Sequence, residues 1–258
     1  MNTVFYNDRS AGKALINPSD LTRPVEGFPE VCISTFSKGI IDKFASLEQV
    51  QVIANLYTAN GVNPVYKIRY SGRDFAFYMS LVGAPACVCG LEEMIAMGTK
   101  KFVFFGSCGV LDDGRAGRNL IVPTAAVREE GTSYHYAAPA DEIMPEPEMT
   151  AVLKKSLDRC GCPYAQGKIW TSDAIYRETM DAINERKKAG CIAVDMEYSA
   201  LLAAAAYRGV KFVQFFYGAD CLDNERWQPR DLTDYGLEGA EKYMALALEC
   251  GMELEDRA

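Results

Sequence analysis

The sequence predicts an α/β fold: a single domain whose central, mixed but largely parallel twisted sheet is flanked by helices. Two observations predict it. Short apolar runs, typical of strands buried on both faces, alternate with helical patterns along the 258 residues. No repeat, low-complexity segment or obvious linker divides the chain. We therefore interpret residues 1–258 as one domain, with residues 1–30 as an N-terminal extension that lies outside the alternating pattern.

The elements follow from two periodicities. The predicted strands are the apolar runs Val31–Ser34, Phe75–Val82, Phe102–Phe105, Leu120–Val122, Cys191–Val194 and Lys211–Tyr217. The predicted helices space their apolar residues at three and four, and three of them stop at a glycine. These helices are Ala86–Met97, Glu148–Arg159, Met196–Arg208 and Leu237–Met252. The stretch Pro139–Glu148, rich in proline and acids, is predicted to be a surface loop.

The composition argues against several classes of protein. A formal net charge of −8 argues against a general nucleic-acid binder, because such proteins carry basic stripes. Neither a signal core nor an apolar stretch of membrane-spanning length is visible, so we expect a cytoplasmic protein that does not enter a membrane. Nine scattered cysteines and a single histidine, His135, favour free thiols over a zinc site, and we expect no metal or organic cofactor.

In sheets of this kind, ligands bind beyond the carboxyl ends of the strands, so the residues that follow each apolar run matter most. The first such stretch is Gly106-Ser107-Cys108-Gly109. We expect a turn here, whose backbone N–H groups and Ser107 hydroxyl can hold an anion. The alternative is a tight turn that needs glycine only for its backbone dihedral angles.

The second stretch contains Asp195, Met196 and Glu197 and opens an alanine-rich helix. A carboxylate fixed at the bottom of a cleft can accept hydrogen bonds from two neighbouring sugar hydroxyls, because it has four lone-pair sites. The alternative is that Asp195 and Glu197 only favour the helix N-terminus through the helix dipole, with Met196 in the core.

The third stretch, Tyr217-Gly218-Ala219-Asp220, follows the apolar run VKFVQFF. An acid at the mouth of a buried strand is partly desolvated, which raises its pKa and lets it deliver a proton. The alternative is a turn aspartate or a helix N-cap. Together, an anion cradle, a sugar-binding carboxylate and a proton donor are the parts that cleave a glycosidic bond.

Four blocks, in this order, resemble the nucleoside phosphorylase I family, which includes purine nucleoside phosphorylase, uridine phosphorylase and the methylthioadenosine nucleosidases. The resemblance runs from about Val31 to the C-terminal helix. The blocks are Leu81–Gly98, Gly106–Val110, Ala193–Leu202 and Gly218–Asp220. The segment Val127–Tyr136 is more similar to the uridine phosphorylase branch.

The resemblance implies roles at the phosphate and ribose ends of a nucleoside. It implies that Ser107 contacts phosphate, with Cys108 and Gly109 in the same phosphate-side segment. It also implies that Glu197 holds the ribose hydroxyls and that Met196 packs against the sugar.

For the base, the resemblance implies that Asp220 protonates or hydrogen-bonds a purine at N7. Ile175 or Tyr176 is expected to stack on the base. Asp195 stands where the family usually has glutamate, and its shorter side chain reaches less far toward sugar or base. The Gln-x-Arg signature of uridine phosphorylases is absent, since the chain reads Arg177-Glu178-Thr179 there.

The departures from the family concern phosphate. Phosphorolytic members carry Gly-Asp-Pro-x-Arg near the N-terminus, where this chain reads STFSKGI from Ser34 to Ile40. They also carry an arginine two residues before the GSCG block, where this chain has Phe104. Arg69 and Lys38 are candidate substitutes. The family's N-terminal histidine is missing as well, and we expect His135 to be an ordinary loop residue.

The first hypothesis is therefore phosphorolysis of a ribonucleoside to free base and ribose 1-phosphate, with purine preferred over uridine. The expected partners are a nucleoside and inorganic phosphate, and the resemblance implies a homo-oligomer, a dimer or a trimer of dimers. The second hypothesis is hydrolysis on the same scaffold. A non-catalytic nucleoside-binding or storage protein is a third, and an unrelated hydrolase using Cys108 and His135 is a fourth.

Overall fold

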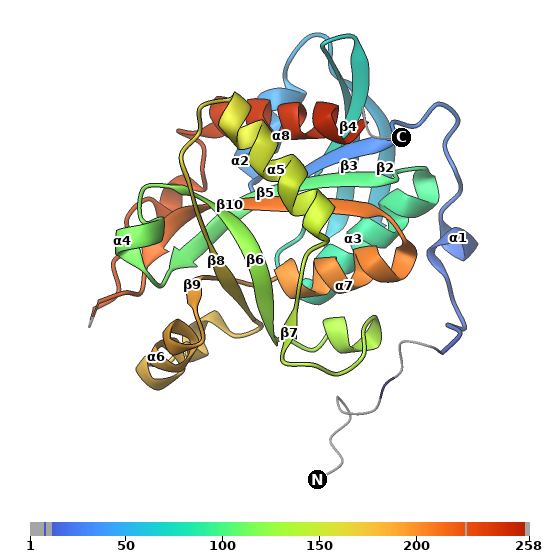
Figure 1. Ribbon diagram of the computed structural model, residues 1–258. Coiled ribbons are helices and arrows are strands. Elements are labelled where there is room, and N and C mark those ends of the chain that lie inside the picture. Colours follow the sequence, from blue (N-terminus) through green and yellow to red (C-terminus); the bar gives the residue numbers. More distant parts are fainter. Residues whose placement is uncertain (1–7, 9–11, 225, 256–258) are drawn as a thin grey trace.

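A ten-stranded mixed sheet forms the centre of the computed structural model, which describes residues 8, 12–224 and 226–255 (Figure 1). Its strand order is β10-β6-β8-β9-β5-β1-β4-β3-β2, with β7 paired to β6. The strands are β1 (Val31–Thr35), β2 (Gln51–Thr58), β3 (Gly61–Tyr70), β4 (Arg73–Met79), β5 (Lys101–Val110), β6 (Leu120–Glu129), β7 (Glu142–Ile143), β8 (Tyr164–Ser172), β9 (Cys191–Asp195) and β10 (Lys211–Cys221).

Five of these strands close into a ring. The strand β5 runs parallel to β10, and β10 meets β6 at the pair Phe216 and Ile121. From β6 the pairing passes in parallel to β8 and then to β9. The strand β9 returns antiparallel to β5 through Gly109 and Val194. The ring therefore brings the C-terminal ends of β5, β9 and β10 together.

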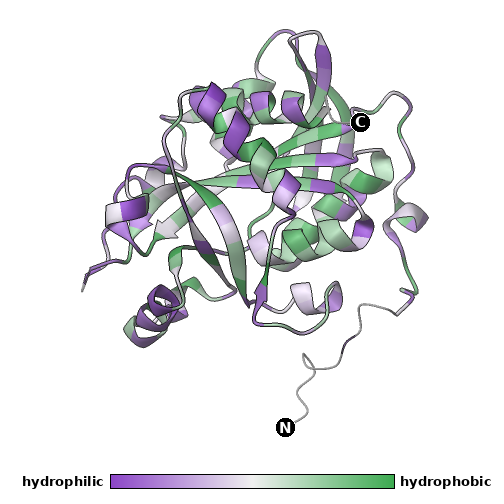
Figure 2. Ribbon diagram, in the orientation of Figure 1, coloured by the Kyte–Doolittle hydropathy of each residue, from purple (hydrophilic) through white to green (hydrophobic). Residues whose placement is uncertain are grey.

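Helices cover both faces of the sheet (Figure 1). On one face, α3 (Ala84–Met97) and α7 (Tyr198–Arg208) pack against each other and against buried strand residues. On the other face lie α2 (Lys38–Ala45), α5 (Pro147–Arg159) and α8 (Ala240–Glu255). Shorter helices are α1 (Pro18–Leu21), α4 (Asp113–Ala116) and α6 (Met180–Lys188). Figure 2 shows hydrophobic central strands and a largely hydrophilic α6, of which only Ile183 is buried.

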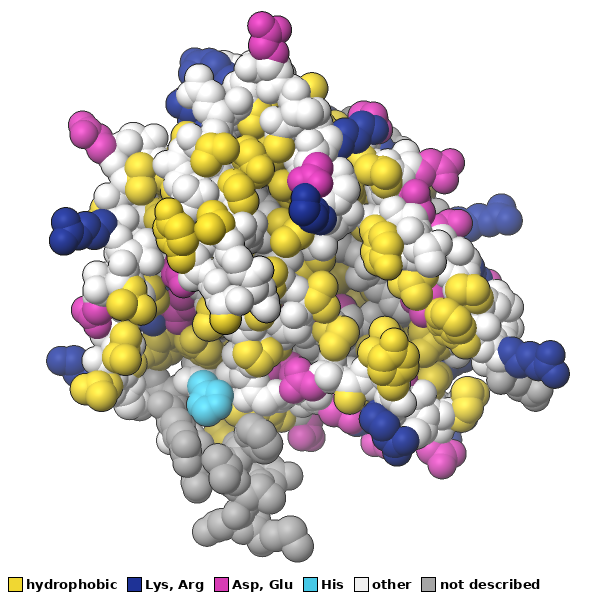
Figure 3. All heavy atoms as spheres, turned by 180° about the vertical axis from the view of Figure 1, so that it is seen from behind, with side chains coloured by type: hydrophobic (Ala, Val, Ile, Leu, Met, Phe, Trp, Pro, Cys, Tyr) yellow, Lys and Arg dark blue, Asp and Glu magenta, His cyan; other side chains and the backbone are white. Residues whose placement is uncertain are grey.

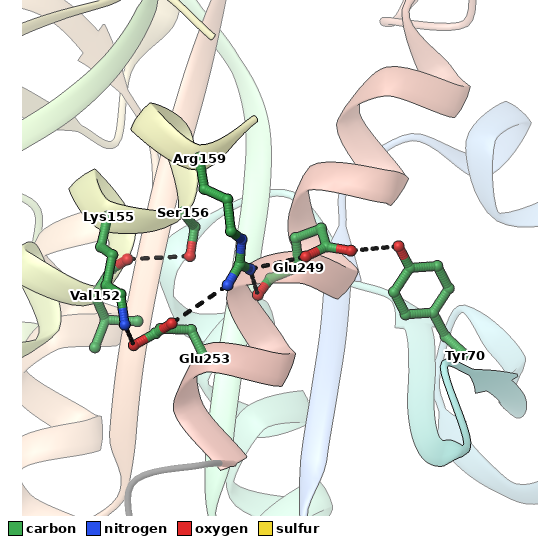
Figure 4. A network of polar contacts seen from close by, with 7 residues as sticks. All are labelled: Tyr70, Val152, Lys155, Ser156, Arg159, Glu249 and Glu253. Carbon is green, nitrogen blue, oxygen red and sulfur yellow. Dashed lines mark hydrogen bonds and ion pairs between the residues drawn. The ribbon is translucent and has the colours of Figure 1, made fainter. Parts of the chain in front are cut away.

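A cluster of polar contacts joins two helices of the second face, α5 and α8, to the β3 strand (Figure 4). Arg159 of α5 contacts the carboxylates of Glu249 and Glu253 on α8, at 2.7 and 3.5 Å. Lys155 pairs with Glu253 at 2.7 Å, and the Tyr70 hydroxyl donates to Glu249 at 2.5 Å. We call this set the α5–α8 cluster. It ties three segments together that are far apart in the sequence.

The predicted fold class is confirmed, with differences in where elements begin and end. The run Phe102–Phe105 continues as β5 to Val110, and Leu120–Val122 continues as β6 to Glu129. The strand predicted over Phe75–Val82 ends at Met79, and α8 begins at Ala240 rather than Leu237. The predicted loop Pro139–Glu148 contains the short β7 and the first turn of α5.

The sequence analysis missed the β2–β3 hairpin, whose burial is largely partial, and α6, of which only Ile183 is buried. Of the N-terminal extension, residues 1–7 and 9–11 lie outside the described residues. Its later part packs on the body of the protein: Val25 donates to the Met97 carbonyl, and Phe28 lies against Gly98. In the part of the chain that the structure describes, no helix combines the length and hydropathy that crossing a bilayer requires. All nine cysteines are free thiols, as expected.

Candidate active site at the ends of β5, β9 and β10

A pocket opens where β5, β9 and β10 end, and it collects all but one of the predicted site residues. The exception is Tyr176, which is 96% exposed and lies outside the pocket, whereas Ile175 lines it. The residues that line the pocket are Phe36, Val82, Ser107, Cys108, Gly109, Ile175, Glu178, Val194, Asp195, Met196, Glu197, Ala219, Asp220, Leu222 and Leu232.

The stretch Gly106–Gly109 is not a turn, so that prediction is wrong. It continues β5, and neither of its glycines has a positive φ. Glycine is needed for space instead. A Cβ on Gly106 would lie 2.8 Å from the Phe36 ring, and one on Gly109 would lie 2.6 Å from Leu222 and 3.3 Å from Asp220 Oδ1. The two glycines let the pocket walls approach the strand.

Ser107 and Cys108 point in different directions, as neighbours on a strand do. The Ser107 side chain is exposed to the pocket. The Cys108 thiol is buried and contacts the Tyr217 carbonyl, and burial raises its pKa well above the ordinary value. His135 lines a separate cavity beside Tyr136. Cys108 and His135 therefore do not form a nucleophile and its base, and the unrelated hydrolase hypothesis fails.

Glu197 lines the pocket at the point where α7 begins. It is the N-cap residue of α7, and its carboxylate accepts a hydrogen bond of 2.6 Å from the Gly83 backbone N–H. Gly83 has a φ of 97°, which glycine tolerates, and it starts α3 from the opposite wall. Burial, followed by the negative charge of Asp195, raises the pKa of Glu197. The carboxyl is thus held by backbone on a rigid helix start.

Asp195 uses both carboxylate oxygens within the protein. One oxygen accepts from the Thr171 hydroxyl at 2.7 Å. The other accepts from the backbone N–H groups of Glu197 and Tyr198 at 3.0 and 2.6 Å. Burial raises the pKa of Asp195, and these three donors oppose that rise. Its geometry is that of a helix cap that orients Glu197, which is the alternative that the sequence analysis left open.

Asp220 enters the pocket through an irregularity in β10. The register between β10 and β5 shifts between Gly218 and Asp220, which is the mark of a β-bulge and re-aims the side chain. The indole N–H of Trp227 donates to Asp220 Oδ2 at 2.6 Å. Burial raises the pKa of Asp220, whereas the Trp227 hydrogen bond and the charge of Arg230 act in the opposite direction.

Two polar side chains of this site escaped the sequence analysis. Trp227 reaches Asp220 from the segment after β10, whose Leu222 and Leu232 also line the pocket. Glu178 follows the 3₁₀ turn Ile175–Arg177 and lines the same pocket. Burial, and then the charge of Asp220, raise the pKa of Glu178 to about 7. No sequence pattern marks Trp227, but an acid three residues after Ile175 was a visible signal for Glu178.

Comparison with known proteins assigns the chain to a family. The family model described as "Phosphorylase superfamily" matches residues 30–247. The chain belongs to the phosphorylase superfamily. A guanosine phosphorylase from Halorubrum lacusprofundi is 26% identical over 186 residues, which cover 70% of this chain and 74% of that protein.

Solved structures of the superfamily share the fold. A uridine phosphorylase from Vibrio fischeri superposes with a TM-score of 0.73 at 20% identity, covering 91% of this chain and 95% of that one. An AMP nucleosidase from Bacteroides thetaiotaomicron gives 0.72 at 17% identity, covering 91% and 92%. The chain is thus a member of an enzyme superfamily, and an AMP nucleosidase shares its fold.

The charged side chains that line the pocket are all acidic. Within the described part of the chain, the lining contains the carboxyls of Glu178, Asp195, Glu197 and Asp220 but neither lysine nor arginine. Phe36 stands in the loop after β1, where phosphorolytic relatives are expected to carry their arginine motif.

The candidate substitutes for the phosphate arginines lie elsewhere. Lys38 pairs with Asp42 one helical turn away, and Arg69 pairs with Asp74 on the neighbouring strand. Neither lines the pocket, so the expectation that one of them replaces the family arginines in this chain is wrong. Phe104 is fully buried, with its ring 6.2 Å from that of Phe36, and belongs to the core.

Proposed function

We propose that this enzyme cleaves the N-glycosidic bond of a purine ribonucleoside and transfers the ribosyl group to water. The observation that carries the proposal is the charge of the pocket: four carboxyls and, among the described lining residues, no cation. Carboxylates stabilise the positive charge that develops on ribose as the bond breaks. Those that are ionised also repel a phosphate anion, and none of the four supplies the positive partner that phosphate needs to bind.

Each site residue has a task in this reaction. Glu197 accepts hydrogen bonds from the ribose hydroxyls, and Asp195 holds Glu197 in place by capping α7. Asp220, whose pKa burial raises, donates a proton to N7 as the bond from C1′ to N9 breaks. The oxygen of water then bonds to C1′, and the proton that this water loses returns through solvent to the Asp220 carboxylate, which leaves free base and ribose. Ser107 and Phe36 form the wall on the side from which we expect water to approach.

Two observations support a purine rather than uracil as the base. Asp220 is an acid in the pocket that can donate a proton to purine N7, and a relative of this chain is named a guanosine phosphorylase. The segment Val127–Tyr136, which is similar to uridine phosphorylases, forms the end of β6 and the turn after it. None of its residues lines the pocket, so its similarity has no bearing on the base.

The experiment is a panel of guanosine, inosine, adenosine and uridine, each assayed with and without phosphate, with sugar products separated by chromatography. We expect free ribose from purine nucleosides at a rate that phosphate does not change. Ribose 1-phosphate formed only with phosphate would contradict hydrolysis. A chain that turns over none of the purine nucleosides would overturn the proposal as a whole.

One observation favours a second candidate, phosphorolysis. The Ser107 side chain is exposed at the end of the pocket where an anion would lie, and it still lacks a cationic neighbour. A second copy of the chain could supply that cation. Figure 3 shows groups of hydrophobic side chains on the surface that such a copy could cover. Phosphate-dependent activity found only in a dimer or larger assembly, measured by light scattering beside the assay, would support this candidate.

A further inference from the structure

A small hollow lies where β6 and β8 begin, separate from the active-site pocket. It measures about 200 Å³ and is lined by Gly117, Arg118, Asn119, Leu120, Pro163, Tyr217, Gly218, Lys242 and Tyr243. We call it the α8 hollow. It shares no lining residue with the active-site pocket, although β10 contributes to both: Gly218 lines the hollow and Asp220 lines the pocket. The hollow is therefore a second cavity, close along β10 to the proposed proton donor.

The two charged side chains of the α8 hollow are both cations. Arg118 follows α4, and Lys242 lies in the first turn of α8. Both side chains are exposed, and neither pairs with a carboxylate among the described residues. No acid stands in the described lining, which is the opposite of the active-site pocket. On a chain with a formal net charge of −8, such a cavity is a place where an anion can bind.

Other donors surround the two cations. The side-chain amide of Asn119 donates to the Arg115 carbonyl at 2.9 Å, and its second N–H is left for a ligand. The first turn of α8 adds backbone N–H groups and the positive end of the helix dipole. That dipole disfavours Lys242 at this position and favours an anion. A phosphate dianion, which only accepts hydrogen bonds, matches this set of donors.

Size and neighbouring charge narrow the choice of ligand. Sites for drug-sized ligands occupy about 300–1,000 Å³, so a hollow of about 200 Å³ admits a phosphate group but not a whole nucleotide. The rings of Tyr217 and Tyr243, stacked with centroids 4.3 Å apart, also line a second hollow. That second hollow carries acids, which repel an anion and confine it to the end formed by Arg118. These acids are Asp231, Asp234 and Glu238.

We propose that the α8 hollow is a phosphate-binding site, which takes a phosphate ion or the phosphate group of a monoester and has no part in cleavage. The anion bridges Arg118 and Lys242, and it thereby joins the segment after α4 to the start of α8. The helix α4 also contacts the segment after β10, because Asp113 pairs with Arg230 at 2.8 Å. The bound anion therefore stabilises the folded chain. Phosphate can thus bind this protein without being its nucleophile.

The test follows the melting temperature by differential scanning fluorimetry while phosphate replaces chloride at constant ionic strength. For the wild type we expect a rise of about 3–5 °C once phosphate exceeds its Kd tenfold. The rise should vanish in the double variant Arg118→Ala with Lys242→Ala, whose cleavage activity should be unchanged. The control, Lys38→Ala with Arg69→Ala, removes two cations that have acidic partners elsewhere, and it should keep the rise.

A further variant separates the α8 hollow from the active-site pocket. Ser107→Ala removes the hydroxyl at which phosphate would bind in phosphorolysis, and the rise should persist in this variant. Isothermal titration of the wild type with phosphate measures the same binding without any substitution, and it should give a dissociation constant that agrees with the thermal shift.

Ribose 5-phosphate distinguishes the two sources of the phosphate group. If it reaches half of its thermal shift at a lower concentration than inorganic phosphate does, the occupant is a monoester; if phosphate does so first, the occupant is the free ion.

Three outcomes would overturn the proposal. The first is no rise with either ligand, and the second is a rise that survives in the double variant. The third is a rise that is lost in Ser107→Ala alone, because phosphate would then bind in the active-site pocket. Binding is read without turnover, so these outcomes do not depend on which nucleoside the enzyme cleaves.

Discussion

Two groups of acidic side chains in this molecule differ in whether they have cationic partners. In the α5–α8 cluster, Glu249 and Glu253 each have a cationic partner, and Arg159 serves both (Figure 4). In the pocket, carboxyls stand together without a lysine or arginine among the described lining residues. The first arrangement fastens helices to each other. The second leaves acceptors and negative charge available to a ligand, at a cost in stability that the rest of the fold must offset.

The largest effect on activity is expected for a substitution in the pocket, at Glu197. Replacing it with alanine removes the carboxyl that is proposed to hold the ribose hydroxyls, and we expect kcat/KM to fall by about 100- to 1000-fold. The melting temperature should stay near that of the wild type, because a buried carboxyl beside Asp195 is lost together with its hydrogen bond from Gly83. Steady-state kinetics and differential scanning fluorimetry check both parts. Full activity in this variant would remove Glu197 from the site.

The reverse pattern is expected at Glu253. Its side chain is 7% exposed and contacts Lys155 and Arg159, whose own side chains are 60% and 45% exposed. Replacing it with glutamine should lower the free energy of unfolding by about 1–2 kcal/mol, since the partners remain partly solvated. Cleavage activity at a temperature well below unfolding should not change. Urea titration followed by circular dichroism measures the first, and a fall in kcat/KM would show that the two regions are coupled.

The raised pKa values of the pocket carboxyls should make the stability of the protein depend on pH. Burial raises the pKa of Glu178 to about 7 and also raises that of Glu197, so between the unfolded pKa near 4.5 and the folded one the native state binds more protons. Stability should then fall as the pH rises across this window. Melting temperatures from pH 5 to pH 8 test this, with Glu178→Gln combined with Glu197→Gln as the comparison. An equal slope in the double variant would assign the effect to other groups.

The smallest effect is expected at Trp227. Phenylalanine keeps a ring but removes the N–H that bonds to Asp220, and that bond lowers the pKa of Asp220. Its loss should move the alkaline limb of the pH–rate profile to higher pH and change kcat/KM at neutral pH about fivefold. Tyr235→Phe, at an exposed position on the same segment, is the control. An unmoved alkaline limb would separate Trp227 from the proton donor.

The sequence was sufficient for those site residues that directly follow an apolar run. Glu197 and Asp220 each come three residues after such a run. The closed ring brings the ends of β9 and β10 together, although β9 runs antiparallel to β5 and β10 runs parallel to it. The extended conformation of Gly106–Gly109 could not be predicted from the sequence. It depends on the pairing of β5 with β9 and β10, whose residues lie far along the chain. The contact between Trp227 and Asp220 could not be predicted for a related reason, because it forms only after the segment beyond β10 turns back.

That the pocket lining lacks the arginines of phosphorolytic relatives was, by contrast, predictable in part. Phe104 and STFSKGI already departed from the phosphorolytic pattern in the sequence. What the sequence could not show is that Lys38 and Arg69 each have an acidic partner elsewhere, since those pairings depend on helix and strand geometry.

The closed ring has a consequence for synthesis of the protein. The strand β5 ends at Val110, but its parallel partner β10 begins only at Lys211. While the intervening residues emerge from the ribosome, an apolar strand has an unpaired edge, which invites pairing with other chains. Nascent chains that stop before residue 211 should therefore aggregate and recruit chaperones, whereas release after α8 should bring the three strand ends together in one late, cooperative step.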